Sequence, residues 1–566
     1  MVKGVLPVAV LSIATGCVDD KYDLTDIDTT SRFTVDNLTI PVNLETISLD
    51  DVVNLDDNEN ISKINIDGKE VYAIKKAGNI NSNEISINGI HVTAPSIPST
   101  NVNLSLPTIP SVGNIPPFDL PIPVTPEKDY SIEMNNLDKA LISLDDVKTT
   151  NPINVELQLS IPQALMNNGG NIARFQNLDI RLPWGLITDD MNYDRNTGVY
   201  HINDLAVDAN GKATVFFQAH GLDLMGNGTI SNNRLEISGK VGIQSGSIHF
   251  ELNDVNVPSQ FDLTASYKVS SFDIASFSGD IDYHLDNIDI APISLSDLPD
   301  FLDSPETEIR IANPAITVDI NNPVGTYGLQ GSGVICLTSN FSGGNTTEAR
   351  SDNFTIGRDG AKISFGTPTD GFPEFVEFNN LGNILANNNT GGLPKDITVR
   401  LENLKFSGNV VDFPIGSNLG SADGDYDFTA PLGFGNPSKV VYETTEDGWG
   451  GDDLDDVNIN LLKIRAVCST NLPVGIELNV TPVDKYGNLI PVKEPKNLKV
   501  RPYCQDEEVY IEIAGANGPI RNFDGVRFRA IISQDDDNNT EAIGPDLQIQ
   551  LSNIRATVDG YFETDF

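Results

Sequence analysis

Hydrophobic and polar side chains alternate along most of this chain, and that alternation restricts the folds open to it. Side chains at every second position lie on the same face of a β-strand. A clear example is the run Phe261, Leu263, Ala265, Tyr267 and Val269. The 3.6-residue period of an amphipathic helix is not sustained anywhere in the sequence. For a chain of 566 residues, the pattern therefore predicts an all-β protein with several β-sandwich domains in tandem.

Shifts in composition divide the expected strands into regions. The predicted regions are 1–16 (signal peptide), 17–93 (N-terminal β region), 94–127 (Pro-rich), 128–290 (sandwich), 291–420 (sandwich) and 421–566 (C-terminal sandwich). The boundaries near 128 and 291 depend on a degenerate repeat, because ISLDDV at 142–147 and ISLSDL at 293–298 are each followed by Asn-Pro. A third copy begins at Ile47. Asn-Pro is typical of a turn that leads into an edge strand, so the repeat indicates duplicated β-domains.

The Pro-rich region holds nine prolines between Pro95 and Pro126. Proline has no N–H for a sheet ladder and has a fixed φ, which excludes a central strand. The region is predicted to be an extended spacer with polyproline II character. Its apolar residues leave an alternative open, in which the segment packs along a sheet edge.

The first 17 residues have the pattern of a secretory signal. Lys3 precedes an apolar run from Val5 to Ile13, which is shorter than the roughly 20 residues that a bilayer span needs. Ala-Thr-Gly then leads to Cys17, and this junction resembles a bacterial lipobox, although Ala14 stands where Leu or Val is commoner. The resemblance implies cleavage before Cys17 and acylation of this cysteine, which would be the lipid anchor. The alternative is an ordinary signal peptide in which Cys17 is incidental.

An acidic stretch follows the lipobox. Asp19 and Asp20 lie in the sequence Cys-Val-Asp-Asp-Lys-Tyr-Asp, which resembles the export signal of Bacteroidetes surface lipoproteins. The whole segment from Cys17 to Thr30 is similar to the start of many such proteins. The resemblance implies a location on the outer membrane, facing outward, and it implies no particular activity.

The net charge restricts the partners. Thirty-six Lys and Arg oppose 80 Asp and Glu, for a formal charge of −44. Nucleic acid is excluded as a partner because a phosphate backbone needs a basic surface. Electrostatic docking on anionic lipid is excluded for the same reason. The expected partners are the membrane, through acylated Cys17, and a glycan or another envelope protein.

Motifs for catalysis are missing from the sequence. It contains no Gly-x-Ser-x-Gly elbow, no Walker loop and no His-Glu-x-x-His helix, and its five histidines are scattered. We therefore expect a non-enzymatic binding or scaffold protein without a cofactor. Three alternatives stay open: a glycan-binding component of a polysaccharide-uptake system, a glycoside hydrolase with an unrecognised carboxylate pair, and a lipid carrier.

One acidic loop is a candidate ligand site. An aromatic side chain lies among carboxylates on a glycine-rich segment formed by Asp447, Trp449, Asp452, Asp453, Asp455 and Asp456. Carboxylate oxygens are the ligands that Ca²⁺ prefers, and an exposed Trp can stack on a sugar. The alternative is a solvated loop whose Trp packs on its own domain.

Three cysteines follow Cys17. Cys468 and Cys504 lie in the same C-terminal region and are a candidate disulfide, because the cell surface permits such bonds. Cys336 is then expected to be a buried apolar residue. Separately, the Asn-Pro pairs that bracket residues 313–323 resemble the strand entry of late-embryogenesis-type-2 (WHy) domains, a resemblance that implies a β-sandwich.

Overall fold

The structure is a computed structural model, and it is all-β, as predicted. It describes residues 30–41, 47–48, 61–66, 68–108, 115–166, 170–182, 185–224, 226–253, 257–295, 304–311, 313–385, 393–433, 438–448, 457–493, 498–534 and 542–565. Within these ranges the helical elements are short 3₁₀ turns, at Gln163–Leu165, Gly325–Tyr327 and Leu381–Asn383. None of the helices in the described part has the length and apolar character needed to span a membrane.

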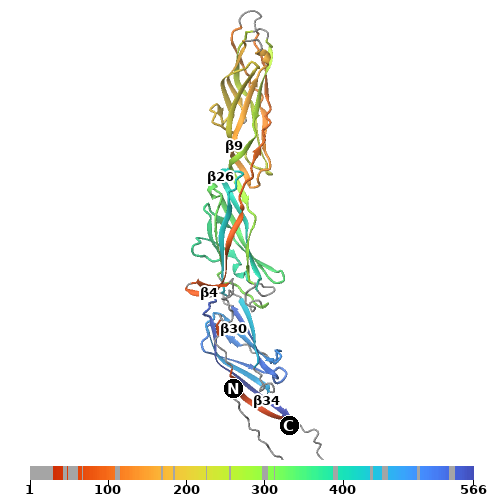
Figure 1. Ribbon diagram of the computed structural model, residues 1–566, viewed down its shortest axis with the longest axis vertical. Helices are drawn as coiled ribbons and strands as arrows, with labels where there is room; N and C mark the ends of the chain where they lie inside the picture. The colour runs from red at the N-terminus through yellow and green to blue at the C-terminus, as the bar shows by residue number, and fades with distance from the viewer. Residues whose placement is uncertain are drawn as a thin grey trace, which may run out of the picture. The chain divides into compact units, whose positions relative to one another are not determined.

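The chain folds into two compact units that are discontinuous in sequence. Unit 1 combines residues 1–54, 439–535 and 545–566, and unit 2 combines residues 55–438 and 536–544. Along the sequence, the chain therefore passes from unit 1 to unit 2 and then back to unit 1. The short segment 536–544 belongs to unit 2 again, and residues 545–566 belong to unit 1. Each unit is described separately below (Figure 1).

Unit 1 is a two-layer sandwich. One sheet has the order β1 (Thr30–Pro41), β34 (Gln548–Asp565), β29 (Val457–Thr470) and β32 (Glu507–Ile513), and β2 (Ile47–Ser48) also pairs with β34. The other has the order β28 (Ser438–Glu446), β33 (Phe523–Gln534), β30 (Gly475–Asp484) and β31 (Leu498–Val500). Both sheets contribute to one core, since Leu462 and Val558 of the first cluster with Val480 and Val526 of the second, all 2 % exposed or less.

Unit 2 contains three sheets, the largest with 13 strands. Its main path is β11 (Leu186–Ile187), β14 (Lys212–Asp223), β9 (Leu141–Ser160), β17 (Phe272–His284), β26 (Asp396–Pro414), β20 (Gln330–Asn340), β21 (Thr346–Ser351) and β25 (Phe378–Asn379). Side branches are β5 (His91–Val92), β6 (Thr100–Ser105), β16 (Gln260–Val269), β18 (Ile288–Ser294) and β22 (Phe354–Ile356). The strands at its centre are long, and Figure 1 labels two of them, β9 and β26.

Two six-stranded sheets complete unit 2. The first has the order β12 (Tyr193–Asp194), β13 (Val199–Ala206), β10 (Ile172–Arg181), β15 (Leu235–Glu251) and β7 (Phe118–Pro121), with β8 (Lys128–Met134) on β15. The second has the order β24 (Glu374–Val376), β23 (Ala361–Phe365), β19 (Ala315–Ile320), β27 (Ser421–Pro431), β4 (Lys69–Glu84) and β3 (Ile61–Ile66).

Each six-stranded sheet packs on a different part of the 13-stranded sheet. Tyr200 of β13 stacks on Phe217 of β14 with ring centroids 5.1 Å apart. Phe354 of β22 meets Phe365 of β23 edge to face at 5.6 Å. Unit 2 is therefore two sandwiches that share one sheet, joined where β17 pairs with β26 from Ser276↔Pro414 to His284↔Lys405.

The domain boundaries differ from those expected at 93, 290 and 420. β4, from the expected N-terminal region, pairs with β27, from the expected C-terminal sandwich, so both belong to unit 2. The boundary expected at 290 falls between two sandwiches that share a sheet. The boundary expected at 420 lies further along the chain, because the long segment of unit 2 ends at Ser438. The physical reason is that alternation identifies a strand and one buried face, but does not identify the neighbouring strand.

The Pro-rich segment is part of unit 2 in the structure, so the spacer interpretation is corrected. β6 pairs with β16 and β7 pairs with β15. Leu104 and Ile122, from this segment, are 4 % and 5 % exposed. Both strands lie at sheet edges, where a strand that lacks some N–H donors is tolerated. This is the arrangement that the edge-packing alternative anticipated.

The two Asn-Pro pairs behave differently. Asn313 has a φ of 54° directly before β19, which fits a turn that leads into a strand. Asn151-Pro152 instead lies inside the continuous strand β9. There β9 changes partner, from β17 up to Thr149 to β16 from Val155 onward. The missing proline N–H thus falls where no ladder partner is required.

Candidate functional site

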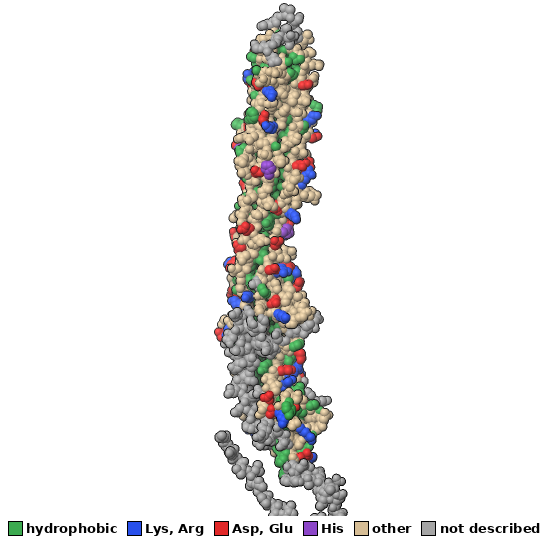
Figure 2. Space-filling view, turned by 45° about the vertical axis from the view of Figure 1, so that its right-hand side comes forward, with side chains coloured by type: hydrophobic (Ala, Val, Ile, Leu, Met, Phe, Trp, Pro, Cys, Tyr) green, Lys and Arg blue, Asp and Glu red, His purple; other side chains and the backbone are tan. Residues whose placement is uncertain are grey.

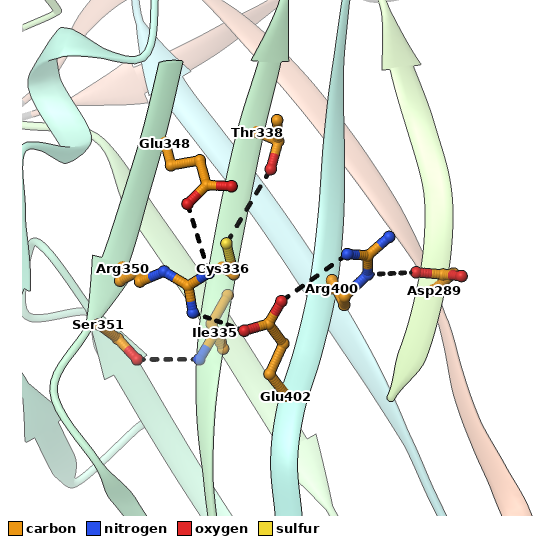
Figure 3. A network of polar contacts seen from close by, with 9 residues as sticks. All are labelled: Asp289, Ile335, Cys336, Thr338, Glu348, Arg350, Ser351, Arg400 and Glu402. Atoms are coloured by element: carbon orange, nitrogen blue, oxygen red, sulfur yellow. Dashed lines mark hydrogen bonds and ion pairs between the residues drawn. The ribbon is translucent and has the colours of Figure 1, made fainter. Parts of the chain in front are cut away.

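A connected cluster of charged side chains lies on one face of the shared sheet (Figure 3). Register places Asp289 of β18, Arg400 of β26, Cys336 of β20 and Arg350 of β21 in one row across four strands. Glu402 lies two residues beyond Arg400 on the same face of β26. Because residues opposite each other in a sheet are close, this register alone brings the charges together.

Glu402 connects the two arginines. Arg350 Nη1 donates to Glu402 Oε2 at 2.5 Å, and Arg400 Nη1 lies 3.8 Å from Glu402 Oε1. Each guanidinium also has a second carboxylate, since Arg400 Nε donates to Asp289 Oδ1 at 2.5 Å and Arg350 Nη2 donates to Glu348 Oε2 at 3.3 Å. The Glu402 side chain is 13 % exposed, whereas that of Arg350 is 48 % exposed. The cluster is therefore partly sheltered at its centre and open at its rim.

Cys336 lies beneath these charges. Its phase on β20 points outward, yet it is only 2 % exposed, and Arg350 and Glu402 lie next to it on the neighbouring strands (Figure 3). Burial is the main reason why the pKa of the Cys336 thiol is raised above its ordinary value. Its Sγ lies 4.0 Å from Thr338 Oγ1. As expected from the sequence, Cys336 is a buried residue, and its burial disfavours the thiolate form.

The chemistry of this cluster is that of a structural clamp. The Glu402 hydrogen bond raises the pKa of Arg350, and the Asp289 hydrogen bond does the same for Arg400. Both guanidiniums therefore stay charged and bound to carboxylates. Among the residues that the structure describes, no group of three or more His, Cys, Asp or Glu side chains is arranged to hold a metal ion.

All five histidines pair with aspartates. The pairs are His91–Asp273, His201–Asp179, His220–Asp189, His249–Asp119 and His284–Asp282, with N···O distances of 2.6 to 3.4 Å. Three of the pairs, at His91, His201 and His249, are directly opposite in the sheet register. Figure 2 shows acidic and basic side chains interspersed on the visible face. These three histidines therefore belong to the same cross-strand pairing as the arginines, whereas His284 and Asp282 are two positions apart on β17.

Asp179 illustrates how these pairs act on a carboxyl group. Partial burial raises the pKa of Asp179, but hydrogen bonds from Ser245 and His201 outweigh burial and leave the pKa below its ordinary value. Ser245 Oγ donates to Asp179 Oδ2 at 2.7 Å, and His201 Nδ1 lies 2.7 Å from Asp179 Oδ1. Both carboxylate oxygens are thereby occupied, which suits a structural role.

Most of the site residues predicted from the sequence lie outside the described residues. This applies to Cys17, Asp19 and Asp20, and to the part of the acidic loop formed by Trp449, Asp452, Asp453, Asp455 and Asp456. The beginning of that loop is described. Asp447 is exposed, and the adjacent Gly448 N–H donates to Asp524 Oδ2 at 3.2 Å. The Ca²⁺ and sugar interpretations of the loop stay predictions.

The structure brings the other predicted pair together. Cys468 and Cys504 are both free thiols, 0 % and 7 % exposed, with their Sγ atoms 4.0 Å apart. Sequence reasoning missed the cluster around Glu402, although a signal existed. Arg400 and Glu402, like Glu348 and Arg350, are opposite charges two positions apart on predicted strands, and such pairs share a face.

An exposed aromatic stack lies on the sheet of unit 1. Phe33 of β1 and Phe562 of β34 are 45 % and 37 % exposed, and their rings stack at 5.0 Å with planes 12° apart. On the other face, the Arg32 guanidinium lies 4.0 Å from the centre of the Tyr561 ring and donates to Glu563. These contacts join the first described strand to the last.

No family model matches this sequence, and no curated protein matches it. Among solved structures, the chain is similar to a protein of Parabacteroides distasonis that is described as secreted, at 16% identity over 50% of this chain and 90% of that one, with a TM-score of 0.36. It is also similar to an archaeal virus turret protein with a triple jelly roll (10% identity, 84% and 90% covered, TM-score 0.10) and to the Faustovirus major capsid protein (7%, 98% and 93%, 0.10). Likenesses with these TM-scores support no statement about function.

Proposed function

We propose that this protein is a lipid-anchored, non-enzymatic β-protein of the bacterial outer membrane surface, where it acts as a scaffold or binding module. The observation that supports this most is the place of β1. Twelve residues separate Cys17 from Thr30, where β1 begins. A chain of that length spans at most about 45 Å. An acylated Cys17 would therefore hold unit 1 near the membrane surface.

The pairing of β1 suits an anchored strand. β1 lies antiparallel to β34 from Thr30↔Asp565 to Pro41↔Arg555, and β34 in turn pairs with β29 inside the sheet. Tension transmitted from the anchor to β1 would be resisted by the hydrogen bonds of this ladder and by the Arg32–Glu563 ion pair.

The polar side chains of unit 2 also favour a structural role. Arginines, histidines and carboxylates pair across strands, as around Glu402 and Asp179. A catalytic carboxylate pair would need free oxygens that face a substrate. The clamp around Glu402 and the pair at Asp179 use their oxygens within the sheet.

Anchoring is tested by expressing the full chain in a Bacteroidetes host with Cys17→Ala, and with Cys336→Ala as the matched control. We expect the parent and Cys336→Ala to incorporate an alkyne-labelled fatty acid and to sediment with outer membranes, and Cys17→Ala to do neither. Fatty-acid labelling of Cys17→Ala would overturn the anchor. Protease added to intact cells should degrade the parent, and complete protection would overturn the outward orientation.

The non-enzymatic part of the proposal has its own test. The purified full chain is incubated with a panel of host and plant polysaccharides, and released reducing ends are measured. We expect no release above a heat-denatured control. Release on any glycan would overturn this part of the proposal. Retention on a glycan without release would identify the binding partner, and Trp449→Ala would then test the acidic loop.

A further inference from the structure

The two buried cysteines of unit 1 are held together by the backbone around them. Thr470 N donates to Cys504 O at 2.9 Å, and Asp506 N donates to Ser469 Oγ at 2.9 Å. These bonds extend the β29–β32 ladder, whose last described pair is Cys468↔Glu507. The segment that carries Cys504 is therefore fixed against the end of β29 by contacts that do not involve either thiol.

The side chains face each other in this frame. Cys504 Sγ lies 4.0 Å from Cys468 Sγ and 3.6 Å from Cys468 O. A disulfide needs an S–S distance of about 2.05 Å, and rotation about the two Cα–Cβ bonds can change the separation of the sulfurs by that amount. Cys336, the other free cysteine among the described residues, belongs to unit 2.

We propose that Cys468 and Cys504 form a disulfide in the exported protein, and that this bond locks β29 to the segment that precedes β32. The two residues are 36 positions apart, so the bond closes a loop that contains β30 and β31. The proposal requires an oxidising compartment. It therefore agrees with the proposed surface location, but it does not require the lipid anchor.

The oxidation is a thiol–disulfide exchange with a donor disulfide, such as that of an envelope oxidoreductase. The Cys504 thiolate attacks one donor sulfur, the donor S–S bond breaks, and a mixed disulfide forms. The Cys468 thiolate then attacks Cys504 Sγ and displaces the donor. Both cysteines lose a proton and together lose two electrons, and the donor leaves as a dithiol.

The timing of this step follows from burial. In the folded, reduced state, burial first and the neighbouring Cys504 second raise the pKa of Cys468 to about 12. The thiolate needed for exchange is then scarce, and both sulfurs are shielded from a protein oxidant. Exchange must therefore precede closure of the sheet, during folding after export. Once formed, the bond is equally shielded from reductants.

The test uses the full chain purified from the envelope without reductant and alkylated under denaturing conditions. We expect one alkylated cysteine, Cys336, and a linked pair of peptides carrying Cys468 and Cys504 that separates on reduction. Three alkylated thiols, or a bond to Cys336, would overturn the proposal. An unmodified Cys17 would appear as an additional alkylated peptide, so failure of the anchor and failure of the disulfide are distinguishable.

Variants measure what the bond contributes. Cys468→Ser, Cys504→Ser and the double variant should each lower the thermal midpoint of unit 1 by about 10 °C, since each loses the same cross-link. The matched control Cys336→Ser should leave the linked peptides intact. If the double variant melts at the same temperature as the parent, although the parent contains the linked peptides, the locking role is overturned.

Discussion

Glu402 of β26 and Arg350 of β21 form an ion pair across an intervening strand, β20, with Nη1 and Oε2 2.5 Å apart. Cys336 lies on that intervening strand and is 2 % exposed. Few side chains are long enough to span two inter-strand spacings of about 4.8 Å each, and Arg with Glu meets that requirement. We expect this contact to be more than a surface ion pair, because it spans the strand that carries the buried Cys336.

Glu402→Gln should therefore weaken unit 2. Glutamine keeps the shape of the Glu402 side chain but removes the negative charge that lies between the guanidinium groups of Arg350 and Arg400. We therefore expect the free energy of unfolding to fall by about 1 kcal/mol. Chemical denaturation of the variant and of the control Glu348→Gln, which removes only the exposed rim carboxylate, would measure this loss. An equal loss in both variants would contradict a central role for Glu402.

The rate at which Cys336 reacts with a thiol reagent should show whether the Arg350–Glu402 pair covers it. Because burial raises its thiol pKa, native protein at pH 8 should react with a maleimide far more slowly than denatured protein. Glu402→Ala removes part of the cover and should accelerate the reaction by an order of magnitude or more. The rate is followed by mass spectrometry of the peptide that carries Cys336. Rates that are the same in the parent and Glu402→Ala would show that other side chains provide the cover.

The stack of Phe33 on Phe562 should couple the two ends of the chain energetically. Offset-stacked aromatic pairs contribute about 1 kcal/mol beyond burial of their area. Phe33→Leu, Phe562→Leu and the double variant form a double-mutant cycle on the free energy of unfolding of unit 1. A coupling energy close to zero would indicate that the exposed rings contribute only their separate areas.

Asp208 should make the β13–β14 turn sensitive to acid. Backbone hydrogen bonds from Lys212 (2.8 Å) and Asn210 (2.9 Å) hold the pKa of Asp208 below its ordinary value of 3.8. A carboxyl whose pKa is lower in the folded state stabilises that state above the unfolded-state pKa. This contribution disappears as the pH falls through the folded-state pKa.

The matching experiment compares the parent with Asp208→Asn. The variant should be less stable than the parent at pH 7, and the difference should shrink as the pH falls below 3.8. Denaturation midpoints at pH 7, 4 and 2.5 measure it, with the exposed Asp129→Asn as control. A difference that does not change with pH would mean that Asp208 acts through its shape and not its charge.

The sequence predicted strands well and their partners poorly. The alternation at Phe261, Leu263 and Ala265 identifies β16, and all three side chains are buried as expected. Nothing in that run shows that β16 pairs with a segment rich in proline, because the edge of a sheet needs only some of a strand's donors. The spacer prediction failed for this reason.

The candidate site shows the same limit. Burial of Cys336 was predicted from its residue type, whereas the cluster that buries it assembles from four strands whose register no local pattern contains. The nearness of Cys468 to Cys504 was anticipated only from their common region of sequence. The sequence signal for the Glu402 cluster was a pair of opposite charges two residues apart on a strand. That signal is not specific, because a chain with 80 acidic residues contains many similar patterns.

The pairing of β1 with β34 has a consequence for biogenesis. Arg32 and Glu563, which form an ion pair between these strands, are 531 positions apart. β1 must therefore wait without this neighbour until β34 has been synthesised. Contacts this distant in sequence form slowly. The sheet of unit 1 that holds β1 is thus completed only after β34 has been made, and a chain truncated before β34 would leave the β1 edge unpaired.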